Sequence, residues 1–384
     1  MSLVPSYGVK RIAWVMVFVG LSCQSAGSAI PSPAATASTP SAGESLPTTT
    51  VQVGLVFNHK LADPKIEAGR ISVVWGAVSS SPSGVLNLLY ASQTGAQVSL
   101  AWLRQNHPDW IEYKCDRRTI PYQFGSVKHV PLDFANPNVQ QWVISTMVAP
   151  ALAAGYSGVG FDNIWLYNGW KRCGHYSTSG RWIAQYSGLE RDPRYAASVL
   201  AWAPAMRDRV HQLVVGPDAA GSSGKSFIFG LNYSFTTAVK LSIQSQLIDT
   251  ADLWLDECGV TRCGRGAPRA SSWVATHSMI HGFYGCYFSS NEMNTNDAAM
   301  RGWALANYLL ERGSCSYLSM ERRQQYGTLL DFPEYHLDPG LPLEAAHLVS
   351  GRWVRRYSHV TVMVNPRTGS FEFVPRTWLG SRTA

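Results

Sequence analysis

The stretch GVGFDN at residues 158–163 is a short apolar run that closes on an acidic and an amide side chain. A second run of this kind, LWLDE at residues 253–257, closes on two acidic side chains. Short apolar runs bounded by polar loops are typical of buried parallel strands, and in an α/β barrel the residues at the carboxyl ends of the strands form the active site. The two runs therefore predict a parallel barrel with carboxyl groups at the ends of two strands.

Working outward, apolar segments of strand length alternate with segments of helical period, which is the pattern of βα units. We expect eight strands, at residues 51–57, 71–75, 110–114, 158–161, 227–232, 253–257, 283–288 and 315–318. No G-x-G-x-x-G motif follows the first strand, so the pattern favours a (β/α)8 TIM barrel over a doubly wound sheet. Alternating valines at 360–364, a turn at 365–369 and a return at 371–374 predict a short C-terminal β appendage packed on the barrel.

The N-terminus predicts export. Lys10 and Arg11 precede an apolar stretch, residues 12–21, which has the length of a signal-peptide core and is too short to span a bilayer. Two processing routes remain open: cleavage near residues 26–29, or lipidation of Cys23. We expect a periplasmic protein, an outer-membrane-anchored lipoprotein or a secreted protein, and membrane attachment only through a lipidated Cys23.

Composition indicates how the chain is divided into segments. Residues 31–50 are almost wholly Pro, Ser, Ala, Thr and Gly, which cannot bury enough apolar surface to offset the entropy of ordering. We expect a signal peptide over 1–29, a flexible linker over 30–50, a glycosidase-like barrel over 51–340 and the β appendage over 341–384.

The cysteines agree with an oxidising compartment. Of seven in the chain, loss or lipidation of Cys23 leaves an even set of six. Cys286 and Cys315 lie on expected neighbouring strands, and Cys258 and Cys263 are close in sequence, so these are the first pairs to test. We find no C-x-x-C spacing and expect no metal and no cofactor. Basic residues are scattered, so we do not expect nucleic-acid binding.

Asp162 and Glu257 are the candidate catalytic residues. Side chains alternate between the two faces of a strand, so Leu253, Leu255 and Glu257 share one face and Asp256 takes the other. If the leucines point into the packed barrel, Glu257 points inward too, and we prefer it to Asp256. Helix capping is the alternative role for Asp162.

Other polar and aromatic side chains at strand ends could bind a sugar, which offers an apolar face and a rim of hydroxyl groups. The loop after the fourth strand is rich in aromatic residues, although any one of them could equally belong to the core. The candidate substrate-binding residues are Asp116, Asn163, Trp165, Asn232, Asp256 and Tyr287.

Several motifs together resemble a known family. They are HPDW at 107–110, YKCD at 113–116, PLDF at 131–134, NP at 136–137, GYSG at 155–158, FDN at 161–163 and DECG at 256–259. This set is similar to bacterial hypothetical glycosyl-hydrolase-like TIM barrels, which are related in turn to the endo-acting polygalactosaminidases. The resemblance spans about residues 51–370, and its specific part is 107–163. It implies a barrel acting on an extracellular polysaccharide, with acids matching Asp162 and Glu257 at the reaction centre.

The sequence therefore predicts an exported glycoside hydrolase that cleaves a polysaccharide with two carboxyl groups. Glu257 would be the general acid/base and Asp162 the nucleophile or charge stabiliser. We favour retention of configuration, because side chains from the fourth and sixth strands can close most of a backbone gap of roughly 10 Å. The alternatives are a non-catalytic carbohydrate-binding barrel and a cell-envelope lipoprotein that acts as a scaffold. The sequence does not indicate an oligomeric state.

Overall fold

The computed structural model describes most of the chain that follows the expected linker. The described residues are 50–57, 71–77, 84–93, 95–96, 98–123, 129–215, 227–234, 236, 239–257, 259–261, 286–313, 315–322 and 325–376. The expected signal peptide, Cys23 and the linker lie outside them.

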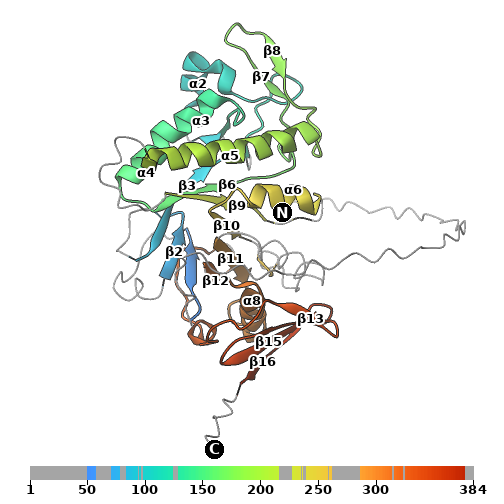
Figure 1. The fold of residues 1–384 in the computed structure, drawn as a ribbon. Helices are drawn as coiled ribbons and strands as arrows, with labels where there is room; N and C mark the ends of the chain where they lie inside the picture. Colours follow the sequence, from blue (N-terminus) through green and yellow to red (C-terminus); the bar gives the residue numbers. More distant parts are fainter. Residues whose placement is uncertain are drawn as a thin grey trace, which may run out of the picture. The chain divides into compact units, whose positions relative to one another are not determined.

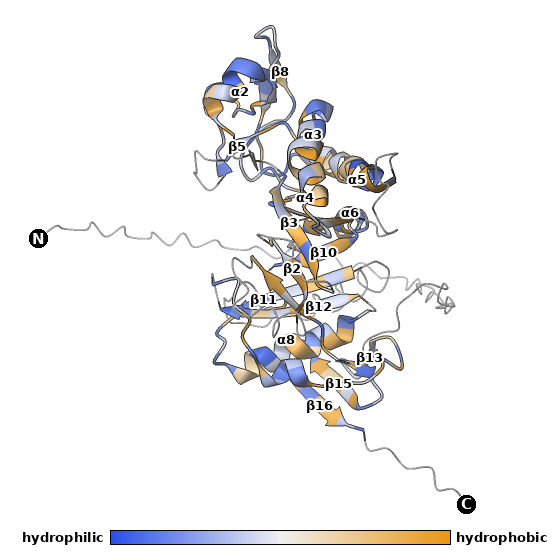
Figure 2. Cartoon of the chain, turned by 90° about the vertical axis from the view of Figure 1, so that its left-hand side faces the viewer, coloured by the Kyte–Doolittle hydropathy of each residue, from blue (hydrophilic) through white to orange (hydrophobic). Residues whose placement is uncertain are grey.

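Eight parallel strands close into a barrel, which confirms the predicted TIM-barrel fold (Figure 1). In chain order they are β1 (Val53–Val56), β2 (Ile71–Trp75), β3 (Leu86–Ser92), β6 (Gly158–Asp162), β9 (Ile228–Asn232), β10 (Leu253–Asp256), β11 (Cys286–Met293) and β12 (Ser316–Arg322). Figure 2 shows strongly hydrophobic colouring along β3 and β10, as expected for parallel strands that are covered on both faces.

Helices lie outside the barrel strands. They are α2 (Leu100–Asn106), α3 (Pro137–Val143), a π-helical turn (Ile144–Val148) that leads into α4 (Ala149–Ala153), α5 (Pro193–Val215), α6 (Leu241–Ile248) and α8 (Ala298–Glu311). Asn136 caps α3 by accepting a hydrogen bond from the backbone N–H of Asn138 at 2.9 Å. On α5, one apolar stripe that includes Val199, Trp202 and Met206 is buried against the strands.

One predicted barrel strand is wrong. Residues 110–114 do not join the barrel: a short 3-10 helix, Pro108–Trp110, is followed only by single bridges from Ile111 to Leu132 and from Tyr113 to Gly174. The third barrel strand is β3, which lies earlier in the chain. Small elements around this region are β4 (Gly95–Ala96), β5 (Val130–Pro131), β7 (Gly174–Tyr176) and β8 (Trp182–Ala184).

The barrel interior is filled by a large side chain set against glycines. The indole of Trp75 is fully buried, and a Cβ atom added at Gly160 or Gly230 would lie 2.6 Å or 2.7 Å from it. Gly54 leaves similar room for the ring of Phe288. The glycine of the GVGFDN stretch is thus required by close packing, because the indole and a β-carbon cannot occupy the same space.

We expect Gly160→Ala to destabilise the fold by about 1–3 kcal/mol, the usual cost of overpacking a core. Urea unfolding followed by circular dichroism measures the change. Thr178→Ala, at an exposed position, is the matched control and should stay within about 0.5 kcal/mol of the wild type. Equal stability of Gly160→Ala and the wild type would contradict the packing described for Trp75.

An antiparallel sheet follows the barrel, as the alternating valines predicted. Its strands are β13 (His347–Val349), β14 (Arg352–Arg356), β15 (Val360–Asn365) and β16 (Ser370–Pro375), and a short 3-10 helix, Pro333–His336, precedes it. In both views α8 lies between the barrel and this sheet (Figures 1 and 2). The Arg355 guanidinium donates to the backbone carbonyls of Leu309, Leu310 and Arg312, so the sheet satisfies the free end of α8.

Two disulfides are present among the described residues. Cys286 and Cys315, at neighbouring strands, are joined with their Cα atoms 4.6 Å apart, which confirms the leading predicted pair. Cys115 and Cys173 form a second bridge that the sequence did not predict. Cys263 and its expected partner lie outside the described residues. In the part of the chain that the structure describes, no helix is long and apolar enough to cross a membrane.

Candidate active site

Three neighbouring strands deliver polar side chains to one edge of the barrel. Asp162 is the last residue of β6, Asn232 is the last of β9, and Glu257 follows β10 directly. Leu253 and Leu255 pack with Trp75 in the barrel interior, so strand alternation directs the next side chain of that face, Glu257, over the barrel mouth. The order of the strands therefore places an amide between two carboxyl groups.

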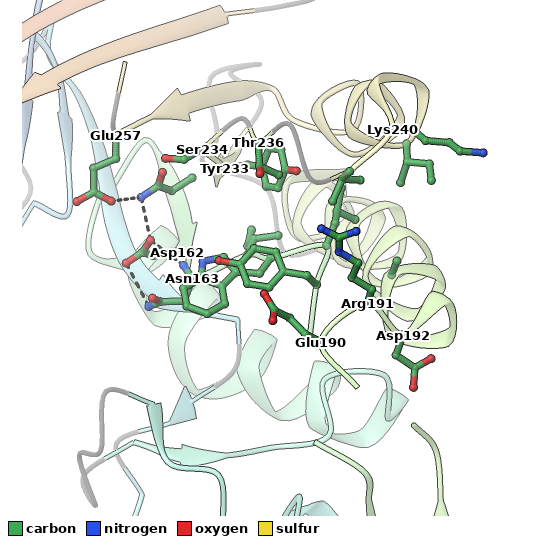
Figure 3. A pocket seen from close by; sticks show the side chains of 18 of the residues that line it. Asp162, Asn163, Glu190, Arg191, Asp192, Tyr233, Ser234, Thr236, Lys240 and Glu257 are labelled. Carbon is green, nitrogen blue, oxygen red and sulfur yellow. Dashed lines mark hydrogen bonds between the residues drawn. The ribbon is translucent and has the colours of Figure 1, made fainter. Parts of the chain in front are cut away.

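The Asn232 amide joins the two carboxyl groups. Its Nδ2 donates to Asp162 Oδ1 at 2.8 Å and to Glu257 Oε2 at 2.7 Å. Because one nitrogen reaches both oxygens, these two oxygens lie no more than about 5.5 Å apart, a spacing compatible with the roughly 5–5.5 Å between the carboxyl groups of retaining glycosidases. The dashed lines in Figure 3 trace this link between Asp162 and Glu257.

Asp162 is held by more donors than Glu257. Its Oδ1 also accepts the backbone N–H of Asn163 at 2.7 Å, its Oδ2 lies 3.2 Å from Asn163 Nδ2, and the Tyr90 hydroxyl bonds the same carboxylate. Burial raises the pKa of Asp162, and these donors oppose that rise. Asn163 has a left-handed backbone with φ 60°, a conformation that Asn tolerates well and that turns its N–H toward the carboxylate.

Glu257 has fewer donors and more acidic neighbours. Burial first, and then the negative charge of Asp162, raise its pKa to about 7, against the hydrogen bonds from Tyr326 and Asn232. Donors that favour the charged form thus gather on Asp162, whereas burial and the charge of Asp162 favour the protonated form of Glu257. This is the division of roles that a carboxylate nucleophile and a general acid require.

Further acidic and aromatic residues line the same mouth, and the sequence did not single them out. Glu292 and Glu321 lie side by side on β11 and β12, and the Tyr326 hydroxyl donates to Glu257 Oε1 at 2.6 Å. Phe57 packs against both Tyr90 and Tyr326, with ring centroids 5.3 Å and 5.4 Å away. In β12, apolar Leu318 and Met320 alternate with polar Ser319 and Glu321. This alternation was the available sequence signal that the strand continues as far as a carboxyl group.

A cleft of about 950 Å³ opens from the carboxyl pair. In Figure 3, Asp162 and Glu257 lie at one end, Tyr233, Ser234 and Thr236 lie along one side, and Arg191 and Lys240 lie at the far end. Its walls combine apolar surface with a few polar groups, as is usual for a small-molecule or sugar site.

Trp165 lines this cleft, as expected for a sugar contact. Its ring stacks nearly parallel to those of Tyr167 and Trp170, at 4.9 Å and 5.1 Å. Together with Asn163 and Asn232, it is one of three expected substrate-binding residues that the structure brings to the carboxyl pair.

The structure does not bring Asp116, Asp256 or Tyr287 to the cleft. Asp116 is exposed and caps its own loop by accepting the backbone N–H groups of Arg118 and Thr119. Asp256 is fully buried on the opposite side of β10 from Leu255. Tyr287 pairs with Trp254 near the start of β11, and their rings pack at 4.9 Å in the core outside the strands. The expectation for Tyr287 assumed that the strand ended near residue 288, whereas it continues to Met293.

No protein-family model and no curated protein matches this sequence. Among solved structures, the chain is similar to the glycoside hydrolase domain of PelA from Pseudomonas aeruginosa, at 12% identity and a TM-score of 0.41, over 70% of this chain and 94% of that one. It is also similar to AmyB, a noncanonic maltogenic α-amylase from Thermotoga neapolitana, at 11% identity and a TM-score of 0.45, over 83% of this chain and 86% of that one. Similarities this weak carry no argument about activity, so function has to be inferred from the site itself.

The described residues do not gather three or more metal-ligating side chains of the His, Cys, Asp and Glu types into a group that could hold a metal ion. The polar groups that converge at this end of the cleft are the Asp162 and Glu257 carboxyl groups and the Asn232 amide.

Proposed function

We propose that this protein is a glycoside hydrolase that cleaves a polysaccharide outside the cytoplasm. The observation that carries the proposal is the Asn232 amide, which donates to Asp162 and Glu257 together. It supports a carboxyl pair at the separation used for glycosidic cleavage, placed at the carboxyl end of a TIM barrel and beside a stacked aromatic wall.

The proposed reaction has two steps. A carboxylate oxygen of Asp162 attacks the anomeric carbon while Glu257 gives its proton to the departing glycosidic oxygen, and the first sugar product leaves as an alcohol. Water then hydrolyses the glycosyl ester on Asp162, with Glu257 taking the proton of that water. Asn232 keeps the two groups at a fixed distance through both steps, because each of its two amide hydrogens is bound to one carboxyl group.

This geometry supports retention of configuration. NMR should detect the first product with the anomeric configuration of the substrate, because a separation of about 5 to 5.5 Å leaves no room for a water molecule between Asp162 and the sugar. Initial release of the inverted anomer would contradict the nucleophilic role of Asp162.

We expect kcat/KM to fall as the pH rises through about 7. Glu257 acts as an acid only when protonated, and its raised pKa of about 7 means that it loses the proton in this range. On the acid side, activity should fall where Asp162 becomes protonated. Initial rates measured across the pH range with one polysaccharide test this, and a rate that keeps rising above neutral pH would contradict the acid role of Glu257.

Incubation with a panel of bacterial exopolysaccharides is the primary test of the proposed function. Both binding and the appearance of new reducing ends are scored. Cleavage supports the proposal. Binding without cleavage would favour a carbohydrate-binding barrel, and neither would favour a cell-envelope scaffold.

Export belongs to the same proposal. Disulfides persist in oxidising compartments, and the bridges at Cys115–Cys173 and Cys286–Cys315 support such a location. Cleavage after the apolar stretch and lipidation of Cys23 remain the two proposed routes, and mass spectrometry of the mature N-terminus distinguishes them.

A further inference from the structure

One tyrosine hydroxyl lies between two carboxyl groups at the barrel mouth. The Tyr326 hydroxyl is 2.6 Å from Glu257 Oε1 and also contacts Glu292 Oε1 at hydrogen-bond distance. Glu292 belongs to β11, and the next strand carries Glu321 at the same level. The edge contact with Phe57 supports the Tyr326 ring.

These contacts require more than one proton. A tyrosine hydroxyl has a single hydrogen to donate, and an ionised carboxylate can only accept. If Glu257 and Glu292 were both ionised, one of the two close oxygen pairs would contain no hydrogen and would be repulsive. Both contacts are therefore hydrogen bonds only when one of the two carboxyl groups carries a proton of its own, which completes a chain of two hydrogen bonds.

The surroundings favour holding that proton. Among the described residues, the charged and titratable groups that face the Glu257–Tyr326–Glu292 hydrogen bonds are Asp162 from β6, Tyr90 from β3 and Glu321 from β12. Glu321 accepts from Ser319 and from the backbone N–H of Val56. These groups are neutral or acidic, and like charges close together in a buried site disfavour complete ionisation.

We propose that Glu257, Tyr326 and Glu292 share one carboxyl proton, and that Tyr326 is the positioning residue through which the proton passes between the two glutamates. In the transfer, the Glu292 O–H bond breaks as a new Tyr326 O–H bond forms, and the original Tyr326 O–H bond breaks as a Glu257 O–H bond forms. Glu292 is left as a carboxylate, Glu257 becomes a carboxylic acid, and Tyr326 is neutral before and after. The use of this proton by Glu257 in catalysis rests on the proposed function, whereas the sharing of the proton does not.

Two variants should move the pKa of Glu257 in opposite directions. Glu292→Gln removes a negative neighbour, so Glu257 should lose its proton at lower pH than in the wild type. Tyr326→Phe removes a hydrogen bond that favours ionised Glu257, so the proton should be lost at higher pH. The Phe ring preserves the contact with Phe57, and Glu372→Gln, at an exposed position on the C-terminal sheet, is a charge-matched control that should change nothing.

Infrared spectroscopy tests the sharing without any substrate. The carbonyl band of protonated carboxyl groups is followed against pH in the wild type and the three variants, with circular dichroism to confirm folding. We expect the midpoint of the band to fall in Glu292→Gln, to rise in Tyr326→Phe and to stay unchanged in Glu372→Gln. Identical titrations in wild type and Glu292→Gln would overturn the proposal, as would shifts of both variants in the same direction.

The alkaline side of the profile of kcat/KM against pH provides a second test. It should shift with the infrared midpoint in each variant, which a purely structural role for Tyr326 would not produce. If the infrared midpoints shift as expected and no glycan is cleaved, the shared proton stands and the proposed hydrolase function fails. If glycans are cleaved and the infrared midpoints do not move, the proposed hydrolase function stands and the shared proton fails.

Discussion

Asp162→Asn and Glu257→Gln are each expected to abolish measurable hydrolysis. Both changes keep the shape of the side chain and remove only its ionisation. Loss of general acid/base catalysis at Glu257 should cost about 10²- to 10⁴-fold in kcat, and the loss at Asp162 should be at least as large because the covalent step itself disappears. Reducing-end assays measure activity, and glycan binding should persist in both variants because the cleft and its aromatic wall remain.

Asp256→Asn is the matched control for these variants. Its side chain is buried outside the barrel interior, away from the cleft, so its effect on the rate should be milder, and any effect should appear first in thermal stability. An inactive but folded Asp256→Asn beside an active Glu257→Gln would show that the acid has been assigned to the wrong residue.

Arg172→Met is expected to destabilise the protein by about 3–5 kcal/mol, the usual cost of leaving a buried charge without its partner. The Arg172 guanidinium contacts the Glu112 carboxylate, and both side chains are fully buried. Asn168 fixes the arginine backbone from both sides, accepting from its N–H at 2.8 Å and donating to its carbonyl at 2.7 Å. Urea unfolding should register the loss as a lower midpoint.

The double variant Glu112→Gln, Arg172→Met separates the charge from the packing. With the Glu112 carboxylate removed as well, that charge is no longer left without its arginine partner, so the double variant should be more stable than Arg172→Met alone. A double variant that is less stable than the wild type by the summed cost of both single changes would contradict the ion-pair explanation.

The parts of the site that could be predicted from sequence lie on strands that stay apolar to their ends. Asp162 and Glu257 each follow such a run, and the alternation of Leu253 and Leu255 was sufficient to select Glu257 over Asp256 as the residue that reaches the cleft. The Cys286–Cys315 pair could also be predicted, since both residues lie on expected neighbouring strands.

The remaining site residues depend on contacts that local pattern does not reveal. The end of β11 is polar, so Glu292 looked like part of a loop, although polar side chains are suited to the open mouth of a barrel. Tyr90 was missed because residues 110–114 took the place of β3 in the strand count. Tyr326 lies 69 residues from Glu257 in a loop, and Cys115 meets Cys173 between two loops, so only the folded chain brings these partners together.

Because the barrel strands have unequal lengths, the rim of the barrel mouth is higher at β11 and β12 than at β3 and β6. β10 ends level with Ser289, whereas β11 and β12 remain paired up to Met293 and Arg322. On the other side, β3 and β6 end together at Ser92 and Asp162. The described lining of the cleft comes from this lower rim and the loops beyond it. A sugar chain is therefore expected to bind over β6 and β9, on the side of the mouth where the described cleft lies.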